Sequence, residues 1–383
     1  MVILVGMGEK MAERFLPIYL LALGGGTLSV GLLNGMDNLL SALYSFPGGY
    51  LSDRLGHKRA LLLFNLIAMF GYVIVILFPV WYAVIIGSVF FLSWTAISLP
   101  ATMSMVSKAM PTNKRTMGVT MHSLVRRIPM ALGPVVGGFL IAGYGERDGV
   151  RLAFGAALIL GAVALVLQQV LIEDAPGSHT AEGNPLAMHR VMSPDLRNLL
   201  ISDILVRFCE QIPYAFAVIW AIKHVGITAP QFGLLTTIEM ITAMLVYIPV
   251  AYLADKNTKK PFVVITFINF TLFPLVLFFA RSFPLLIVAF VVRGLKEFGE
   301  PTRKALIMDL APEDRKAAMF GYYYLVRDVI VSVAAFGGAL LWDISPAVNF
   351  LTAFGFGVLG TLYFVRFGHD LVNKGEPAGR IAV

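Results

Sequence analysis

The chain has 383 residues, of which 58% are hydrophobic and only 14% are charged, and its mean hydropathy is +0.79. Soluble proteins are roughly 45–50% apolar and about 25% charged, so this composition argues against a soluble enzyme and indicates a membrane protein. A formal net charge of +7 needs no nucleic-acid partner, because membrane proteins concentrate lysine and arginine in their cytoplasmic loops. The single cysteine, Cys209, excludes a disulfide framework and a thiolate metal cluster. We expect no cofactor and no metal.

Apolar stretches long enough to cross a bilayer recur along the chain. A helix needs about 20 apolar residues for this, because lipid offers the backbone no hydrogen-bond partner. The third, sixth, ninth and twelfth stretches contain no charged residue, as does the fourth. The regular recurrence at every third stretch predicts that every third helix faces lipid. In chain order, the twelve predicted spans are 3–22, 28–50, 60–79, 82–107, 116–142, 152–172, 198–222, 230–253, 262–280, 284–309, 317–342 and 346–365.

Basic residues predict the orientation of these spans. If the loop after the second span is cytoplasmic, 18 of the 30 lysine and arginine residues, Arg303 among them, fall in segments on that side. This excess places both termini in the cytoplasm and predicts a multi-pass protein of the inner (plasma) membrane. The first span lacks a basic leading segment and carries Lys10 and Arg14, so we interpret it as a retained helix and not as a signal peptide.

The sequence contains an internal repeat. Residues 173–196 are polar and lack periodicity, which predicts a central cytoplasmic loop between a bundle at 1–172 and a second bundle with a short tail at 197–383. FPGGYLSDRLGHKR after the second span matches IPVAYLADKNTKKP after the eighth at one constant offset. Farther along, Arg126 and Arg327 occupy matching positions. Two halves of equal orientation form a parallel repeat, which is typical of secondary transporters whose site lies between the halves.

The segment GYLSDRLGHKR, residues 49–59, resembles the signature of the major facilitator superfamily, Gly-x-Leu-x-Asp-Arg-x-Gly-Arg-Lys/Arg, although His57 stands where the pattern often has arginine. The resemblance extends over essentially the whole chain. It implies an all-α membrane protein with twelve transmembrane helices in two pseudo-symmetric six-helix bundles, and secondary active transport by alternating access.

The same resemblance implies that this segment acts as a conformational latch that favours the outward-open state. The alternative is that its basic residues only anchor the loop at the membrane surface. Gly56 also permits a positive φ in a tight turn. The residues predicted to form the latch, including one from the second copy of the motif, are Gly49, Asp53, Arg54, Gly56, Arg59 and Asp255.

A glycine-rich motif lies in the fifth predicted span. Gly133, Pro134, Gly137 and Gly138 resemble the core Gly-Pro-x-x-Gly-Gly of drug/proton antiporters. Two earlier glycines of that motif are replaced, one of them by Pro129. The resemblance implies proton-coupled efflux, and the alternative is ordinary close packing of small residues between helices.

Charges inside the spans must be paired or hydrated, since a cation at the bilayer centre costs roughly 2.5–3.5 kcal/mol. The carboxylates available are Glu9, Glu13, Asp37, Asp203, Glu210, Glu239, Glu297, Glu300 and Asp328. Residues three or four apart share a helix face, which predicts the pairs Lys10–Glu13, Asp203–Arg207, Arg207–Glu210, Arg293–Glu297, Lys296–Glu300 and Glu300–Lys304.

In the family that the chain resembles, helices one, four, seven and ten line the cavity, and three of these carry such charges. Arg126 and Arg327 suit an anionic solute, because guanidinium groups bind carboxylate or phosphate at two points; alternatively, each neutralises a nearby carboxylate. Glu13 and Glu210 are the leading candidates for proton coupling. The predicted substrate and proton pathway comprises Glu13, Arg14, Arg126, Arg127, Asp203, Arg207, Glu210, Arg293, Lys296, Glu297 and Arg327.

The sequence thus predicts a secondary transporter and no enzyme, since it has neither an ATP-binding loop nor a catalytic constellation. We expect proton-coupled efflux of a small organic solute by a monomer whose other partners are protons and membrane lipid. The alternatives are proton-coupled uptake of an organic anion and a transporter-like receptor that moves nothing.

Overall fold

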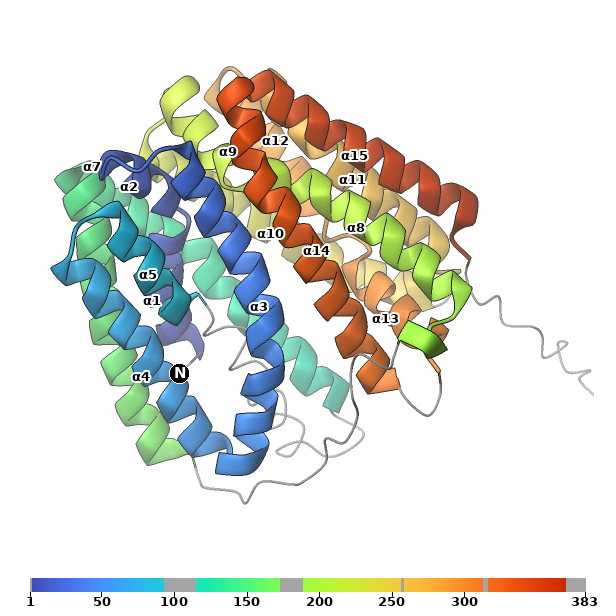
Figure 1. Cartoon of the computed structure of the whole chain (residues 1–383), viewed down its shortest axis with the longest axis horizontal. Coiled ribbons are helices and arrows are strands. Elements are labelled where there is room, and N and C mark those ends of the chain that lie inside the picture. The colour runs from blue at the N-terminus through green and yellow to red at the C-terminus, as the bar shows by residue number, and fades with distance from the viewer. Residues whose placement is uncertain (1, 93–114, 173–188, 256–257, 313–315, 370–383) are drawn as a thin grey trace, which may run out of the picture.

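The computed structural model describes residues 2–92, 115–172, 189–255, 258–312 and 316–369, which form helices and connecting turns without any strand (Figure 1). Within these helices, side chains are described except at 45–54, 57, 115–124, 248, 251–252, 254–255 and 316–318. The predicted all-α fold is confirmed.

The first bundle is built from helices before residue 172, and the second from helices after residue 193. The first comprises α1 (Val2–Glu13), α2 (Leu16–Ala22), α3 (Thr27–Leu55), α4 (His57–Leu77), α5 (Trp81–Phe91) and α7 (Arg115–Leu171). The second comprises α8 (Pro194–Tyr214), α9 (Phe216–Ile219), the π-helix η3 (Trp220–His224), α10 (Ala229–Asp255), α11 (Lys260–Phe279), α12 (Phe283–Leu295), α13 (Glu300–Leu310), α14 (Lys316–Ile344) and α15 (Pro346–Phe367).

Six described helical stretches are long and apolar enough to cross a membrane, and α8 with α9 and η3 makes seven if this bent pair is counted as one span. Helix α7 covers the fifth and sixth predicted spans, and Gly145 interrupts it between them with φ 81° and ψ 171°. Three other predicted spans are broken in the middle. The first divides into α1 and α2, the seventh bends by 40° between α8 and α9, and the tenth divides into α12 and α13.

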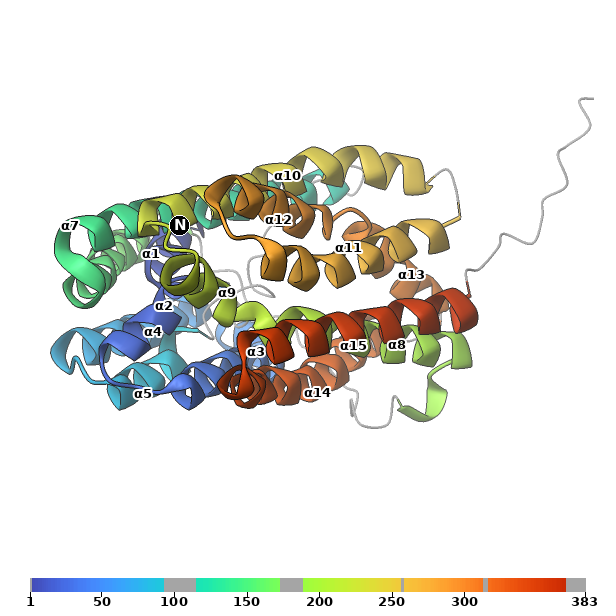
Figure 2. The ribbon, with the colours of Figure 1, turned by 90° about the horizontal axis from the view of Figure 1, so that it is seen from above.

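The two bundles lie side by side (Figure 2). The chain turns through positive φ angles at Gly24, between α2 and α3, at Gly145, within α7, and at Gly226, between η3 and α10. We call the end of the bundles where these elements turn, uppermost in Figure 1, the Gly145 face. Helices α3 and α14 lie close together near this face and diverge toward the opposite one (Figure 1). At the Gly145 face, Lys223 donates to Glu146 and Thr27 to Asp343, and each bond joins one bundle to the other.

Glycines allow the bundles to touch backbone to backbone near the Gly145 face. A Cβ added at Gly138 of α7 would lie 2.6 Å from the Ala229 carbonyl oxygen of α10, and one at Gly233 would lie 2.5 Å from the Pro134 oxygen of α7. Gly31 of α3 faces Ala339 of α14 in the same way, with an added Cβ 2.5 Å from the Ala339 Cβ. Small residues therefore set the distance between the bundles.

We predict that Gly138→Ala weakens closure of the Gly145 face, because the added methyl group meets backbone atoms that belong to the other bundle. A cysteine at Ala339, which is 1% exposed, reports this closure in lipid nanodiscs through its rate of labelling by a maleimide. We expect labelling to become several-fold faster in the Gly138→Ala background. Gly143→Ala is the matched control, since a Cβ there meets no atom within 4 Å. Equal rates in the two backgrounds would contradict the packing argument.

Candidate substrate site

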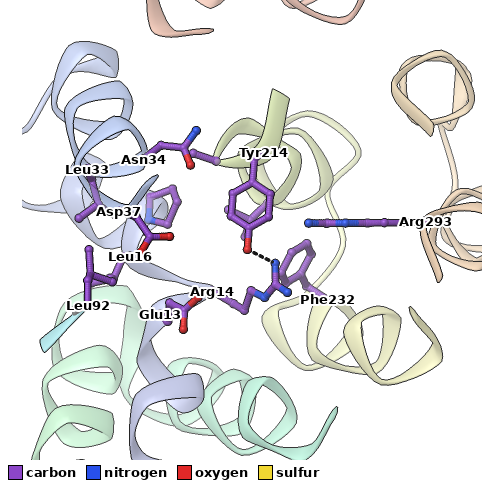
Figure 3. Close-up of a pocket in the computed structure, with 13 residues that line it drawn as sticks. Glu13, Arg14, Leu16, Leu33, Asn34, Asp37, Leu92, Tyr214, Phe232 and Arg293 are labelled. Carbon is purple, nitrogen blue, oxygen red and sulfur yellow. Dashed lines mark hydrogen bonds between the residues drawn. The ribbon is translucent and has the colours of Figure 1, made fainter. Parts of the chain in front are cut away.

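A cavity lies between the bundles (Figure 3). Its apolar wall includes Leu16, Leu33, Leu92, Val218 and Phe232, which come from both bundles. Its polar lining consists of Glu13, Arg14, Asn34, Asp37, Tyr214 and Arg293. Such a lining, mostly apolar with a few convergent polar groups, is typical of sites for small organic molecules.

The breaks in two helices place polar side chains at this cavity. Arg14 lies in the turn between α1 and α2, where Pro17 occupies the first turn of α2. Tyr214 is the last residue of α8 and follows Pro213. The Arg14 Nη1 donates a hydrogen bond of 2.8 Å to the Tyr214 hydroxyl, so that the bond joins the two bundles across the cavity (Figure 3).

Two carboxylates, Glu13 and Asp37, lie together on one side of the cavity (Figure 3). Glu13 accepts a hydrogen bond from Lys10, whose Nζ also lies 3.0 Å from Glu9. Asp37 of α3 has no hydrogen bond or ion pair to another residue in the described part of the chain. The carboxylate most available to a solute or a proton is therefore that of Asp37.

Arg293 of α12 forms the opposite side of the cavity (Figure 3). It is 3% exposed, and its Nε lies 3.2 Å from the Oε1 of Glu239 in α10. The guanidinium carbon is 5.2 Å from the centre of the Tyr214 ring and 5.1 Å from that of Phe273. These rings favour a cation over their faces, which holds the guanidinium beside the cavity.

A charged network extends from Arg293 into the second bundle. Glu239 lies 3.9 Å from the Nζ of Lys296, and this lysine donates a hydrogen bond of 2.6 Å to Glu210. Glu210 also accepts a hydrogen bond of 2.6 Å from Arg207, which lies 3.5 Å from Glu300. Charges on four helices are thus connected, and each carboxylate of this network has cationic neighbours.

Arg303 of α13 lies at the far end of this network and is fully buried. It donates to Asp203 of α8 and, at 2.8 Å, to each carboxylate oxygen of Glu300. The hydroxyl of Tyr323 donates to Asp203 at 3.0 Å. Arg327 lies 3.4 Å from the same carboxylate. The basic-residue count treated Arg303 as a charge of a cytoplasmic segment, whereas its charge is neutralised by carboxylates inside the bundle.

The sequence matches a known family along its whole length. A model of the Major Facilitator Superfamily matches residues 1–209 and 199–380. The chain belongs to the major facilitator superfamily. An uncharacterized MFS-type transporter of Methanocaldococcus jannaschii is 22% identical over 355 residues, which cover 90% of this chain and 87% of that protein. The quinolone resistance protein NorA of Staphylococcus aureus is 25% identical over 150 residues, 39% of each chain.

Solved structures of transporters share the fold. A POT family transporter in complex with 5-aminolevulinic acid matches with a TM-score of 0.79 and 14% identity, over 96% of this chain and 95% of that one. A mutant of the nucleoside transporter NupG matches with a TM-score of 0.79 and 12% identity, over 96% and 97% of the two chains. The protein is thus an MFS secondary transporter with the two-bundle fold of this superfamily.

The structure of this MFS transporter separates the predicted pathway residues into three groups. Glu13, Arg14 and Arg293 line the cavity. The network holds Asp203, Arg207, Glu210, Lys296 and Arg327. Arg127 and Glu297 form an ion pair of 2.9 Å between the bundles. Arg126 has no carboxylate within ion-pair distance among the described residues, so it is not placed like Arg327.

Four of the six ion pairs predicted within single helices are present. Lys10–Glu13, Asp203–Arg207, Arg207–Glu210 and Glu300–Lys304 are all present. The predictions for Arg293 and Lys296 were wrong, because these cations pair with Glu239 and Glu210 on neighbouring helices. Helical spacing identifies partners on one helix and contains no information about contacts between helices.

Most side chains of the predicted latch lie outside those that the structure describes. Gly49, Asp53 and Arg54 belong to α3 and Asp255 ends α10, but their side chains are not described. Gly56 joins α3 to α4 with φ 81° and ψ 152°, a conformation suited to glycine. Arg59 is exposed in the first turn of α4. The role of these residues as a latch stays a prediction.

Proposed function

We propose that this MFS transporter exports a small amphipathic organic solute in exchange for protons. The observation that supports this most directly is the cavity between the bundles, where apolar side chains surround two carboxylates and two arginines. A solute held between the bundles is exposed to one side of the membrane and then to the other as the bundles rock.

Proton coupling requires a carboxylate that changes its charge as the cavity changes sides. Glu210 is poorly suited to this change, because Lys296 and Arg207 each bond to it at 2.6 Å. We propose instead that Asp37 and Glu13 share this role at the cavity. Asp37 is the stronger candidate, since no described residue bonds to its carboxylate, and a proton or a cationic solute competes for the same site.

Two observations favour export. The glycine motif of α7 packs against α1 and α10 through Gly133, Gly137 and Gly138, and its sequence resembles that of drug/proton antiporters. NorA, a resistance protein by name, shares 25% identity over 39% of the chain. We further propose that residues 173–196 join the bundles on the cytoplasmic side, and that the protein works as a monomer in the plasma membrane with both termini in the cytoplasm.

The test uses proteoliposomes loaded with a mixture of amphipathic amines, carboxylates and amino acids. With the lumen made alkaline relative to the outside, proton exchange drives solutes out, and mass spectrometry identifies those that leave. We predict that Asp37→Asn reduces uphill efflux by at least about tenfold while exchange of the same solute between the two sides persists, because exchange needs no proton. The exposed Asp148, substituted by Asn, serves as the control.

The two alternatives give different results in this assay. A proton-coupled anion importer moves carboxylates and protons in the same direction, so under this gradient it accumulates carboxylates in the lumen and exports none, whereas a receptor moves no solute. Arg327, on which the anion hypothesis depended, bonds to Asp328 at 2.7 Å and lies 3.4 Å from Asp203, and it does not line the cavity. Normal uphill efflux by Asp37→Asn would eliminate the proposed coupling site.

A further inference from the structure

We propose that the cavity selects zwitterionic solutes, with the cationic group beside Asp37 and Glu13, the anionic group beside Arg14 and Arg293, and an apolar body against the remaining wall. This inference rests on the proposed function and defines its substrate class. It follows from how charges are separated across one cavity, as Figure 3 shows: both carboxylates are on one side, Arg293 is on the other, and Arg14 reaches between them toward Tyr214.

The side of the cavity that Asp37 and Glu13 form can bind a further cation. Lys10 accounts for one oxygen of Glu13, and no described residue contacts the carboxylate of Asp37 within bonding distance. Asn34, one helical turn before Asp37, donates to the backbone oxygen of Gln211 at 3.0 Å. Its amide therefore faces away from the carboxylate. An ammonium group, which has three donors, can therefore bond to Asp37 without displacing an existing ion pair.

The side of the cavity that Arg14 and Arg293 form can bind an anion. Arg14 bonds only to the neutral phenol of Tyr214 in the described part of the chain, so no carboxylate directly neutralises its charge. Arg293 shares a single oxygen of Glu239 at 3.2 Å and is otherwise surrounded by rings. Two guanidinium groups that converge on one cavity bind a carboxylate more firmly than either does alone.

The balance of charges excludes singly charged solutes as the best occupants. A cation without an anionic group leaves Arg14 facing an apolar wall, and an anion without a cationic group leaves Asp37 in the same position. An unpaired charge in such surroundings is strongly unfavourable. A zwitterion satisfies both sides at once, and its body contacts Leu33, Leu92, Val218 and Phe232.

The experiment measures binding to the purified transporter in nanodiscs, with four probes that share an indole ring. Tryptophan carries both charges, tryptamine only the cation, indole-3-propionate only the anion, and 3-ethylindole neither. We expect tryptophan to bind at least about tenfold more tightly than each singly charged probe. The series of phenylalanine, phenethylamine, 3-phenylpropionate and ethylbenzene repeats the comparison with a smaller body. A singly charged probe that binds as tightly as its zwitterion, or a failure of both zwitterions to bind, overturns the proposal.

Two variants assign each charge of the solute to its side of the cavity. Asp37→Asn removes the preference for tryptophan over indole-3-propionate, and Arg14→Gln removes the preference for tryptophan over tryptamine. The exposed residues Asp148 and Arg366 provide the matched controls Asp148→Asn and Arg366→Gln. If both cavity variants lower the affinity for all four probes equally, their effect is on the fold and the assignment is wrong.

Failure of this inference and failure of the proposed function give different results. Selective binding of zwitterions without proton-driven efflux rejects export and leaves the selectivity intact. If the proton gradient drives efflux of tryptamine as well as it drives efflux of tryptophan, export is supported and the selectivity for zwitterions is rejected.

Discussion

Arg303→Met is expected to lower the free energy of unfolding by about 3–5 kcal/mol, because it removes a buried cation and leaves Asp203 and Glu300 with only their longer contacts to other cations. The Arg303 side chain is 1% exposed and bonds to both Asp203 and Glu300. Methionine fills a similar length without replacing the charge. Thermal unfolding in detergent, followed by the loss of monodisperse protein, measures the effect.

The neighbouring Lys304 supplies the control for Arg303. It also lies within 3.4 Å of Glu300, but its side chain is 46% exposed. Lys304→Met should therefore cost less than about 1 kcal/mol, as exposed ion pairs usually do. Adding Asp203→Asn to Arg303→Met should restore part of the lost stability, since it removes a buried carboxylate that has lost its closest cation. Equal losses for Arg303→Met and Lys304→Met would show that Arg303 is not buried as described.

Gly137→Ala is expected to destabilise the first bundle by about 3 kcal/mol, at the upper end of the effects of overpacking. Gly137 of α7 lies directly against the backbone of α1, and an added Cβ would overlap the carbonyl oxygen of Met11. Gly133 contacts the same stretch of α1, where an added Cβ would lie 2.8 Å from the Cβ of Lys10. Since backbone atoms cannot rotate away, the helices must separate.

Gly143→Ala again provides the comparison within the same helix, because its Cβ would meet no neighbour within 4 Å. We expect this variant to unfold at nearly the same temperature as the unsubstituted protein. Gly137→Ala should also lower the yield of folded protein, whereas Gly138→Ala should change mainly the closure of the Gly145 face. A Gly137→Ala protein as stable as Gly143→Ala would disprove the close approach of α1 and α7.

The fold follows from the sequence because the apolar runs, the interrupting turns and the repeat all depend on local residue pattern. The local pattern also says something about the site. Asp37 is the one charged residue in the predicted span 28–50, and a lone charge in an apolar span was the available signal for a cavity residue. Its position opposite Arg293 was not predictable, since α3 and α12 belong to different bundles and meet only across the cavity. The burial of Arg303 was missed for a related reason, because Asp203 on α8 meets it only in three dimensions. Glu300, three residues earlier on α13, is the partner that helical spacing could have indicated.

The hydrogen bond between Arg14 and Tyr214 gives solute binding a mechanical consequence. One partner belongs to the first bundle and the other to the second, and the bond spans the space that cargo must occupy. An arriving carboxylate competes with the phenol for the guanidinium, because a charged acceptor binds it more strongly than a neutral one. Binding of the solute therefore replaces a direct hydrogen bond between the bundles with contacts that pass through the solute. Release of the solute restores the hydrogen bond.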